Sequence, residues 1–232
     1  MSDIRLYDLA GADLERRFSP YCWRTKLAIA HKGLSVATLP WRFTDKEAIA
    51  FSGQGRVPVI VDGDKTIFDS WTIAVYLEAS YPERPSLFGG DAGLALTRFI
   101  NSWTDKILQP ALAPLVLIDI YAHVIERDRE YFRTSREKAF GMTLEQISAG
   151  RDDTVIAFRQ ILEPLRAVLQ TQPYLAGQQP AYADYIVLGA FQWARCISPF
   201  KLLLDDDVVA AWRTRMMDAC GGIAGRALGY AV

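Results

Sequence analysis

The segment RFSPYCWRTK, residues 17–26, contains the tetrapeptide Ser-Pro-Tyr-Cys. With cysteine in place of Ser19, this tetrapeptide would be a Cys-x-x-Cys dithiol whose first sulfur attacks disulfides. Here Cys22 keeps the second position, and a hydroxyl occupies the position of the attacking sulfur. Either dithiol chemistry has been lost, or the reactive sulfur comes from elsewhere.

Ser19 precedes a predicted helix. Pro20 suits the first helical turn and Gly33 suits the C-terminal cap. A helix N-terminus stabilises a thiolate through partial positive charge and unpaired N–H groups, and a hydroxyl adds a hydrogen bond to the sulfur. An ordinary thiol is only about 3% ionised at pH 7, whereas lowering its pKa by about two units makes about three quarters thiolate. The alternative for Ser19 is helix capping alone.

The elements that position this helix end alternate in type. β-like runs are expected at residues 4–7, 35–40, 57–61 and 65–68, and Asp62-Gly63-Asp64 indicates a hairpin between the last two. Helical patterns start at Pro20 and cover residues 45–51 and 70–81. The predicted order is β-α-β-α-β-β-α, a small α/β unit.

A segment rich in proline and glycine, PERPSLFGGDAG, follows this unit and indicates a linker. Beyond it the sequence predicts only helices, one of them bent at Pro110 and Pro114. The expected helical ranges are 94–123, 127–140, 143–170, 181–197 and 207–219. We therefore predict an α/β domain over residues 1–82, a linker over 83–93 and an all-helical domain over 94–232.

The composition excludes several classes of function. The 232 residues are 50% hydrophobic with a formal net charge of −1, which disfavours nucleic acid or an anionic membrane as the main partner. No apolar run reaches the roughly 18 residues of a membrane span, and the N-terminus lacks a signal-peptide core. Three distant cysteines and two histidines form no disulfide framework and no metal spacing. These features predict a soluble cytoplasmic protein without a metal.

Four segments, in this order, resemble those of the cytosolic glutathione transferases: SPYCWRTKLAIAHKGL, GRVPVIVDG, FDSWTIAVYLE and YADYIVLGAFQWAR. The resemblance runs over essentially the whole chain and implies a thioredoxin-like N-terminal domain, an all-helical C-terminal domain and a homodimer. Within the family, DIYAHVIERDREYFRTSREKAFGMTLEQ together with ADYIVLGAFQWARC resembles the bacterial β-etherases of lignin breakdown and their fungal relatives.

The resemblance implies that the missing sulfur belongs to glutathione, which Ser19 would hold as a thiolate. The Val57-Pro58 bond would be cis, leaving the preceding backbone free to pair with the cysteinyl part of the tripeptide. Asp69 and Ser70, at the start of another helix, would bind the γ-glutamyl ammonium and carboxylate.

Cationic side chains complete the implied glutathione site. Arg56 would reach the glycyl carboxylate, and Lys46 and Arg42 are further candidates. The alternative for Lys46 and Arg42 is a solvated surface charge.

The second substrate is expected to be a hydrophobic electrophile in a cleft between the domains. The candidate lining residues are Tyr21, Trp103, Ile107, Tyr121 and Trp193. The predicted reaction is attack by the glutathione thiolate on an electrophilic, aromatic substrate, as in detoxification or aromatic catabolism. If the finer resemblance holds, the substrate is a β-aryl ether next to a carbonyl.

Two other functions remain open on the sequence. Cys22 could serve a thiol–disulfide or deglutathionylating enzyme, or the chain could bind glutathione and other ligands without turnover. Tyr7, at the end of the first strand, is a competing thiol activator, although we expect it to pack in the sheet.

The helix expected at residues 181–197 departs from the family pattern at its start. Asp184 is expected to be structural there, but Ala181 stands where Ser or Thr normally completes the capping box. The missing cap should cost on the order of 1 kcal/mol unless another contact compensates.

Overall fold

The structure is a computed structural model that describes residues 4–231. Its four strands form one sheet in the order β2-β1-β3-β4, in which β1 pairs parallel with β2 and antiparallel with β3, and β3 pairs antiparallel with β4. The strands are β1 (Ile4–Leu9), β2 (Val36–Trp41), β3 (Val59–Asp62) and β4 (Lys65–Phe68).

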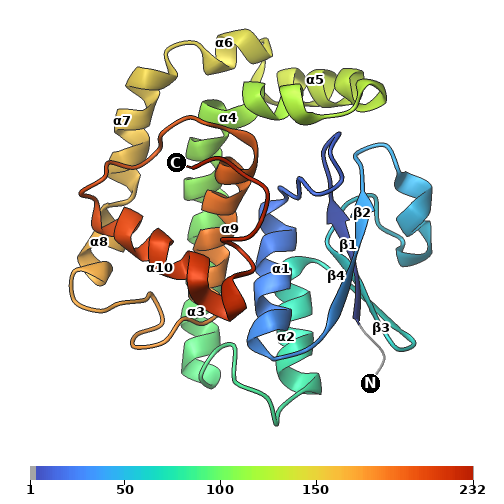
Figure 1. Ribbon diagram of the computed structural model, residues 1–232, viewed down its shortest axis with the longest axis vertical. Coiled ribbons are helices and arrows are strands. Elements are labelled where there is room, and N and C mark those ends of the chain that lie inside the picture. Colours follow the sequence, from blue (N-terminus) through green and yellow to red (C-terminus); the bar gives the residue numbers. More distant parts are fainter. Residues whose placement is uncertain (1–3, 232) are drawn as a thin grey trace.

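Three helical segments accompany this sheet: α1 (Pro20–His31), the 3₁₀ segment η1 (Lys46–Ser52) and α2 (Ser70–Ser80). The order confirms the predicted β-α-β-α-β-β-α unit. In Figure 1, α1 and α2 lie between the sheet and the helical half of the molecule. The N-terminus of α1 is therefore placed where the two halves meet.

The second half is helical, as predicted, but two of its helices are divided. The helices are α3 (Asp91–Trp103), α4 (Gln109–His123), α5 (Glu126–Phe140), α6 (Leu144–Ser148), α7 (Arg151–Ile161), α8 (Glu163–Leu169), α9 (Tyr182–Ile197) and α10 (Val208–Gly222).

The helix predicted over 94–123, with a bend at Pro110 and Pro114, is interrupted before Pro110 by a π-helical segment, η2 (Thr104–Leu108), and Pro114 lies inside α4. The prediction of a single helix over 143–170 was wrong, because three helices, α6, α7 and α8, occupy this range. Gly150, with φ +70°, separates α6 from α7, and α8 begins with Pro164 in its first turn. A left-handed residue cannot continue an α-helix, so the periodic pattern is divided there.

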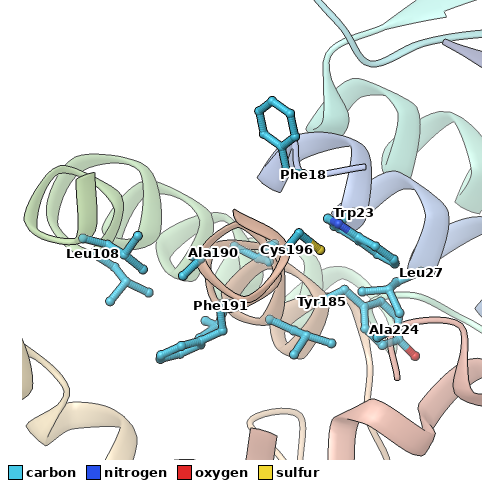
Figure 2. Close-up of a cluster of buried hydrophobic side chains, with 14 of the residues drawn as sticks. Phe18, Trp23, Leu27, Leu108, Tyr185, Ala190, Phe191, Cys196 and Ala224 are labelled. Atoms are coloured by element: carbon cyan, nitrogen blue, oxygen red, sulfur yellow. The ribbon is translucent and has the colours of Figure 1, made fainter. Parts of the chain in front are cut away.

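The core continues from one half of the molecule into the other. α9 is buried along nearly its whole length. Figure 2 shows Tyr185 and Cys196 of α9 close to Trp23 and Leu27 of α1. Because α1 packs on α9, the N-terminal end of α1 depends on the helical half for its position.

Asp184 offsets the missing cap at Ala181. Its buried carboxylate accepts the backbone N–H groups of Leu175 at 2.8 Å, Ala176 at 3.1 Å and Ala181 at 3.2 Å. It also accepts the indole N–H of Trp212 at 2.9 Å. Four donors on one carboxylate compensate the lost serine or threonine cap, and they give Asp184 the structural role expected of it.

Across residues 4–231, none of the helices combines the length and apolar character that a membrane span requires. The same residues contain no cluster of three or more His, Cys, Asp or Glu side chains that could hold a metal ion.

Candidate active site

A cavity of about 400 Å³ lies where the start of α1 meets the helical half. Ser19, Pro20 and Tyr21 line it from α1, together with side chains of the loops after β2 and before β3. α4, α5 and Trp193 of α9 line the rest. The cavity therefore combines the N-terminus of a helix with a largely apolar wall from the other half of the chain.

A second, more open hollow of about 450 Å³ lies around Arg151, Arg159 and Phe200. Its cations already have partners, because Arg151 pairs with Asp119 at 2.8 Å and the Nε–H of Arg159 donates to the Leu202 carbonyl at 2.8 Å. The cavity at α1 is the better candidate for chemistry.

Ser19 is the N-cap of α1 and lines the cavity. Its backbone is extended, with φ −64° and ψ 123°, and its Oγ accepts the N–H of Cys22 at 3.2 Å. The side chain is buried, yet accepting this bond uses only a lone pair and leaves the O–H proton available for donation. Capping and holding a thiolate are therefore compatible roles for the same hydroxyl.

Cys22 is fully buried one helical turn further on. Burial raises the pKa of its thiol far above the ordinary value. Its Sγ contacts the Tyr7 carbonyl oxygen at 3.8 Å and has no access to the cavity, whose lining does not include it. Because a redox thiol must ionise and be accessible, this environment disfavours dithiol chemistry.

Tyr7 packs within the sheet region, as expected. Its ring lies 5.6 Å from that of Phe51, centroid to centroid, and Tyr7 is not among the residues that line the cavity.

The predicted glutathione residues before β3 lie at the cavity. The Val57-Pro58 peptide bond is cis. Val57, Arg56 and Lys46 all line the cavity. Nζ of Lys46 donates to the Gly55 carbonyl at 2.5 Å, which holds its charge beside the loop that carries Arg56.

Asp69 and Ser70 lie at the start of α2, outside the cavity lining. Asp69 has φ +68° and caps α2 by accepting the backbone N–H of Thr72 at 2.9 Å. Ser70 is buried, and its carbonyl accepts the hydroxyl of Tyr182 at 2.7 Å. Asp69 therefore caps α2, and the role of this pair toward a ligand stays a prediction.

Arg42 also lies outside the lining. Its guanidinium donates to the carbonyls of Gly11 and Ala12, each at 3.3 Å, and so fastens the loop between β1 and α1. These bonds indicate a structural part for Arg42.

Of the residues predicted to contact the second substrate, Tyr21 and Trp193 line the cavity, whereas Trp103, Ile107 and Tyr121 do not. Burial raises the pKa of Tyr21, so its phenol stays protonated.

The helical phase explains the difference. The cavity face of α4 is formed by Gln109, Ala113, Leu117 and Ile120. Tyr121 is rotated by about 100° from Ile120, and its ring lies under Arg133 at 4.6 Å instead. Ile107 precedes this face and is 47% exposed. The prediction took aromatic and apolar side chains along a helix bent at Pro110 and Pro114, and the side chains that line the cavity lie on one face of α4 after the π-helical segment.

α5 and the loop after β2 contribute a wall of the cavity that was not predicted from the sequence. These lining residues are Phe43, Tyr131, Phe132, Arg136 and Phe140. The spacing of four between Phe132, Arg136 and Phe140 was the available signal, because it places all three on one helical face.

Buried polar contacts hold this wall in place. The carboxylate of Asp128 on α5, only 1% exposed, accepts the N–H of Phe43 at 2.9 Å and the hydroxyl of Thr44 at 2.5 Å. Figure 1 shows α5 crossing above the end of the sheet. These bonds tie the helix to the loop that follows β2, so the cavity walls from both halves are joined.

A second polar network joins α1 to the floor of the cavity. The guanidinium of Arg24, on α1, donates to Asn101 at 3.1 Å and to Asp105 at 2.8 Å. Asp105 also accepts from Gln109, a lining residue, at 3.1 Å. The network fixes the position of α1 relative to α4.

Comparisons with known proteins agree with this arrangement. Residues 18–80 match the family model described as "Glutathione S-transferase, N-terminal domain", and residues 95–216 match "Glutathione S-transferase, C-terminal domain". Glutathione S-transferase 4 of Zea mays is 28% identical over 188 residues, which cover 77% of this chain and 74% of that protein.

Two fungal structures are similar over nearly the whole chain. Glutathione transferase GSTFuA3 from Phanerochaete chrysosporium superposes with a TM-score of 0.83 at 23% identity and covers 93% of this chain and 96% of its own. CsGST63524 of Ceriporiopsis subvermispora, solved in complex with glutathione, gives a TM-score of 0.75 at 25% identity. The match covers 97% of this chain and 94% of that protein. Both family models match in order, and the C-terminal model alone covers more than half of this chain. The chain therefore belongs to the glutathione S-transferase family.

Proposed function

We propose that this chain is a glutathione transferase in which the Ser19 hydroxyl holds the glutathione sulfur as a thiolate. The observation that carries the proposal is the position of Ser19: it caps α1, lines the cavity and keeps an O–H to donate. The similar protein from Ceriporiopsis subvermispora, solved with glutathione, supports glutathione as the co-substrate.

The residues around Ser19 fit the tripeptide. Glutathione is anionic, and Lys46 and Arg56 supply two positive charges on the sheet side of the cavity. We propose that the backbone of Val57, a lining residue, pairs with the tripeptide in the manner of an added strand. We propose that Asp69 and Ser70 bind the γ-glutamyl end at the N-terminus of α2.

In the proposed reaction the glutathione sulfur attacks an electrophilic carbon of an aromatic substrate. A C–S bond forms, and the leaving group departs with the electron pair of the broken bond. Ser19 and the first turn of α1 stabilise the sulfur anion before attack. Tyr21, kept protonated by burial, is placed to donate a hydrogen bond to an oxygen of the electrophile.

We propose a β-aryl ether next to a carbonyl as the candidate electrophile. The aromatic wall of α5 and Trp193 suit an aryl substrate, and a neighbouring carbonyl lowers the barrier to displacement so that the protein mainly positions the partners. Incubation of the enzyme with glutathione and a β-aryl ether ketone should release a phenol, and absence of release would exclude this substrate class without affecting the role of Ser19.

We also propose that the chain forms a homodimer in the cytoplasm. Leu96 and Phe99, one helical turn apart on α3, are 71% and 68% exposed. Large apolar side chains gathered on a surface are typical of an interface.

The test of the main proposal is the ultraviolet titration of bound glutathione in Ser19→Ala. A hydrogen bond to a charged group contributes about 1.5–3 kcal/mol, so its loss should raise the thiol pKa by about one to two units and lower turnover at neutral pH. Ser19→Thr, which keeps a hydroxyl, should restore much of the effect, and Cys22→Ser should leave the titration unchanged. An unaltered titration in Ser19→Ala would refute the role of Ser19, whereas loss of activity in Cys22→Ser alone would favour thiol–disulfide chemistry.

A further inference from the structure

The charged residues of the cavity are all of one sign. Lys46 and Arg56 line it from the sheet side, and Arg136 lines it from α5. No aspartate or glutamate is among the lining residues that the structure describes. The cavity is therefore cationic, with one positive charge contributed by the helical half.

Arg136 is held between aromatic rings. Its guanidinium carbon lies 4.9 Å from the ring centroid of Phe132 and 5.6 Å from that of Phe43. Its Nη1 donates to Ser135 Oγ at 3.0 Å. A guanidinium has five N–H donors, so most of them remain available to a ligand in the cavity.

The neighbouring Arg133 provides a contrast on the same helix. Its guanidinium pairs with Glu137 at 2.9 Å and with Glu145 at 2.8 Å, outside the cavity. Within residues 4–231, no carboxylate forms such a pair with Arg136, and the nearby charge that acts on it is the cation Arg56. Burial lowers the pKa of Arg136, and the positive charge of Arg56 lowers it further. A partly buried cation beside another cation is unfavourable unless an anion joins them.

From this geometry we infer that Arg136 is an anion subsite on the electrophile side of the cavity, and that the second substrate is an aromatic compound with a carboxylate. The inference rests on the proposed function and specifies its substrate class. The glycyl carboxylate of glutathione is left to Lys46, the first residue of η1, and Arg56, in the loop between η1 and β3.

The surroundings of Arg136 favour an aromatic acid over a simple anion. Phe140 and Leu117 line the same cavity, so an aryl ring can bury its faces while its carboxylate meets the guanidinium. The planar fork of arginine matches a carboxylate with two parallel hydrogen bonds. The buried bonds of Asp128 to the loop after β2 keep α5, and thus Arg136, in place.

The test compares Arg136→Gln with the wild type on a matched pair of electrophiles: chlorodinitrobenzene, which is neutral, and chloronitrobenzoate, which carries a carboxylate. We expect kcat/KM for the benzoate to fall by about 10- to 100-fold, as for loss of a charged hydrogen-bonded pair, with KM rising more than kcat falls. The kcat/KM for chlorodinitrobenzene and the KM for glutathione should each change by no more than about two-fold. Arg136→Lys should restore part of the loss.

Lys138→Gln is the matched control, because it removes the same charge from an exposed position on the same helix. It should leave both electrophiles unaffected, and an equal loss for the benzoate there would indicate long-range electrostatics and overturn the subsite. Equal losses for both electrophiles in Arg136→Gln would show a structural role. A raised KM for glutathione alone would assign Arg136 to the tripeptide. Either result overturns the inference.

Failure of the proposed function is separable from failure of the subsite. If the wild type conjugates neither electrophile, the proposed function fails, and binding of unreactive nitrobenzoate by calorimetry still tests Arg136. The subsite predicts binding that is weakened at least about 10-fold in Arg136→Gln. Equal binding by the two proteins refutes it.

Discussion

Replacing Gly189 by alanine should displace the active-site end of α1. Gly189 lies in α9, where a Cβ would be 2.5 Å from the Pro20 carbonyl oxygen and 3.1 Å from Cγ of Arg24. Real Cβ contacts start near 3.0 Å, so α1 and α9 must separate by at least 0.5 Å, the difference between 3.0 and 2.5 Å. Because Pro20 follows Ser19 directly, that movement is transmitted to the hydroxyl.

The effects of Gly189→Ala on stability and on activity have separate causes. Overpacking a core costs about 1–3 kcal/mol, whereas alanine gains about 1 kcal/mol over glycine within a helix, so the free energy of unfolding should fall by about 0–2 kcal/mol. A misplacement of about 1 Å at a reacting group can cost 100-fold in rate, so we expect about a 10-fold loss of kcat/KM for a shift of half that size. Urea unfolding and conjugation kinetics on purified Gly189→Ala measure the two effects.

A double-mutant cycle with Ser19→Ala separates displacement of the hydroxyl from a general loss of structure. If Gly189→Ala acts by moving Ser19, its effect on kcat/KM should largely disappear once the hydroxyl is absent. Unchanged kinetics in Gly189→Ala, or a loss that simply adds to that of Ser19→Ala, would refute the reasoning.

Three further predictions concern Asp105, His31 and Phe99. Asp105→Ala leaves the buried guanidinium of Arg24 without its 2.8 Å ion pair and should lower the free energy of unfolding by about 3 kcal/mol in urea titrations, with Asp105→Asn milder because it still accepts a hydrogen bond. Burial lowers the pKa of His31 below its ordinary 6.5, so the unfolded chain takes up the proton first as the pH falls. Stability should therefore decrease as the pH is lowered through 6.5, and His31→Gln should flatten this dependence in unfolding curves measured across that range. Phe99→Glu should reduce the mass found by sedimentation from two chains to one, and a wild-type protein that sediments as a single chain would contradict the homodimer.

The local sequence was sufficient for the elements that carry the chemistry. Pro20 and the preceding Ser19 define the start of α1 through backbone preferences that act within a few residues, and the α1 N-terminus lies where they predict. The β-α-β-α-β-β-α order followed from alternation and from the Asp62-Gly63-Asp64 turn for the same reason. The identity of the thiol source came from the resemblance to a family, because an absent cysteine does not name the molecule that replaces it.

The tertiary structure alone decided which side chains face the electrophile. Trp103 and Tyr121, predicted as aromatic residues of a bent helix, lie outside the cavity, because α4 lines it with a different face that includes Ala113 and Leu117. Arg136 enters the cavity because Asp128 ties α5 to a loop more than eighty residues away. The direction in which each helix presents its side chains, and the contacts between distant segments, depend on the packing of the whole chain. Short-range sequence patterns therefore do not predict them.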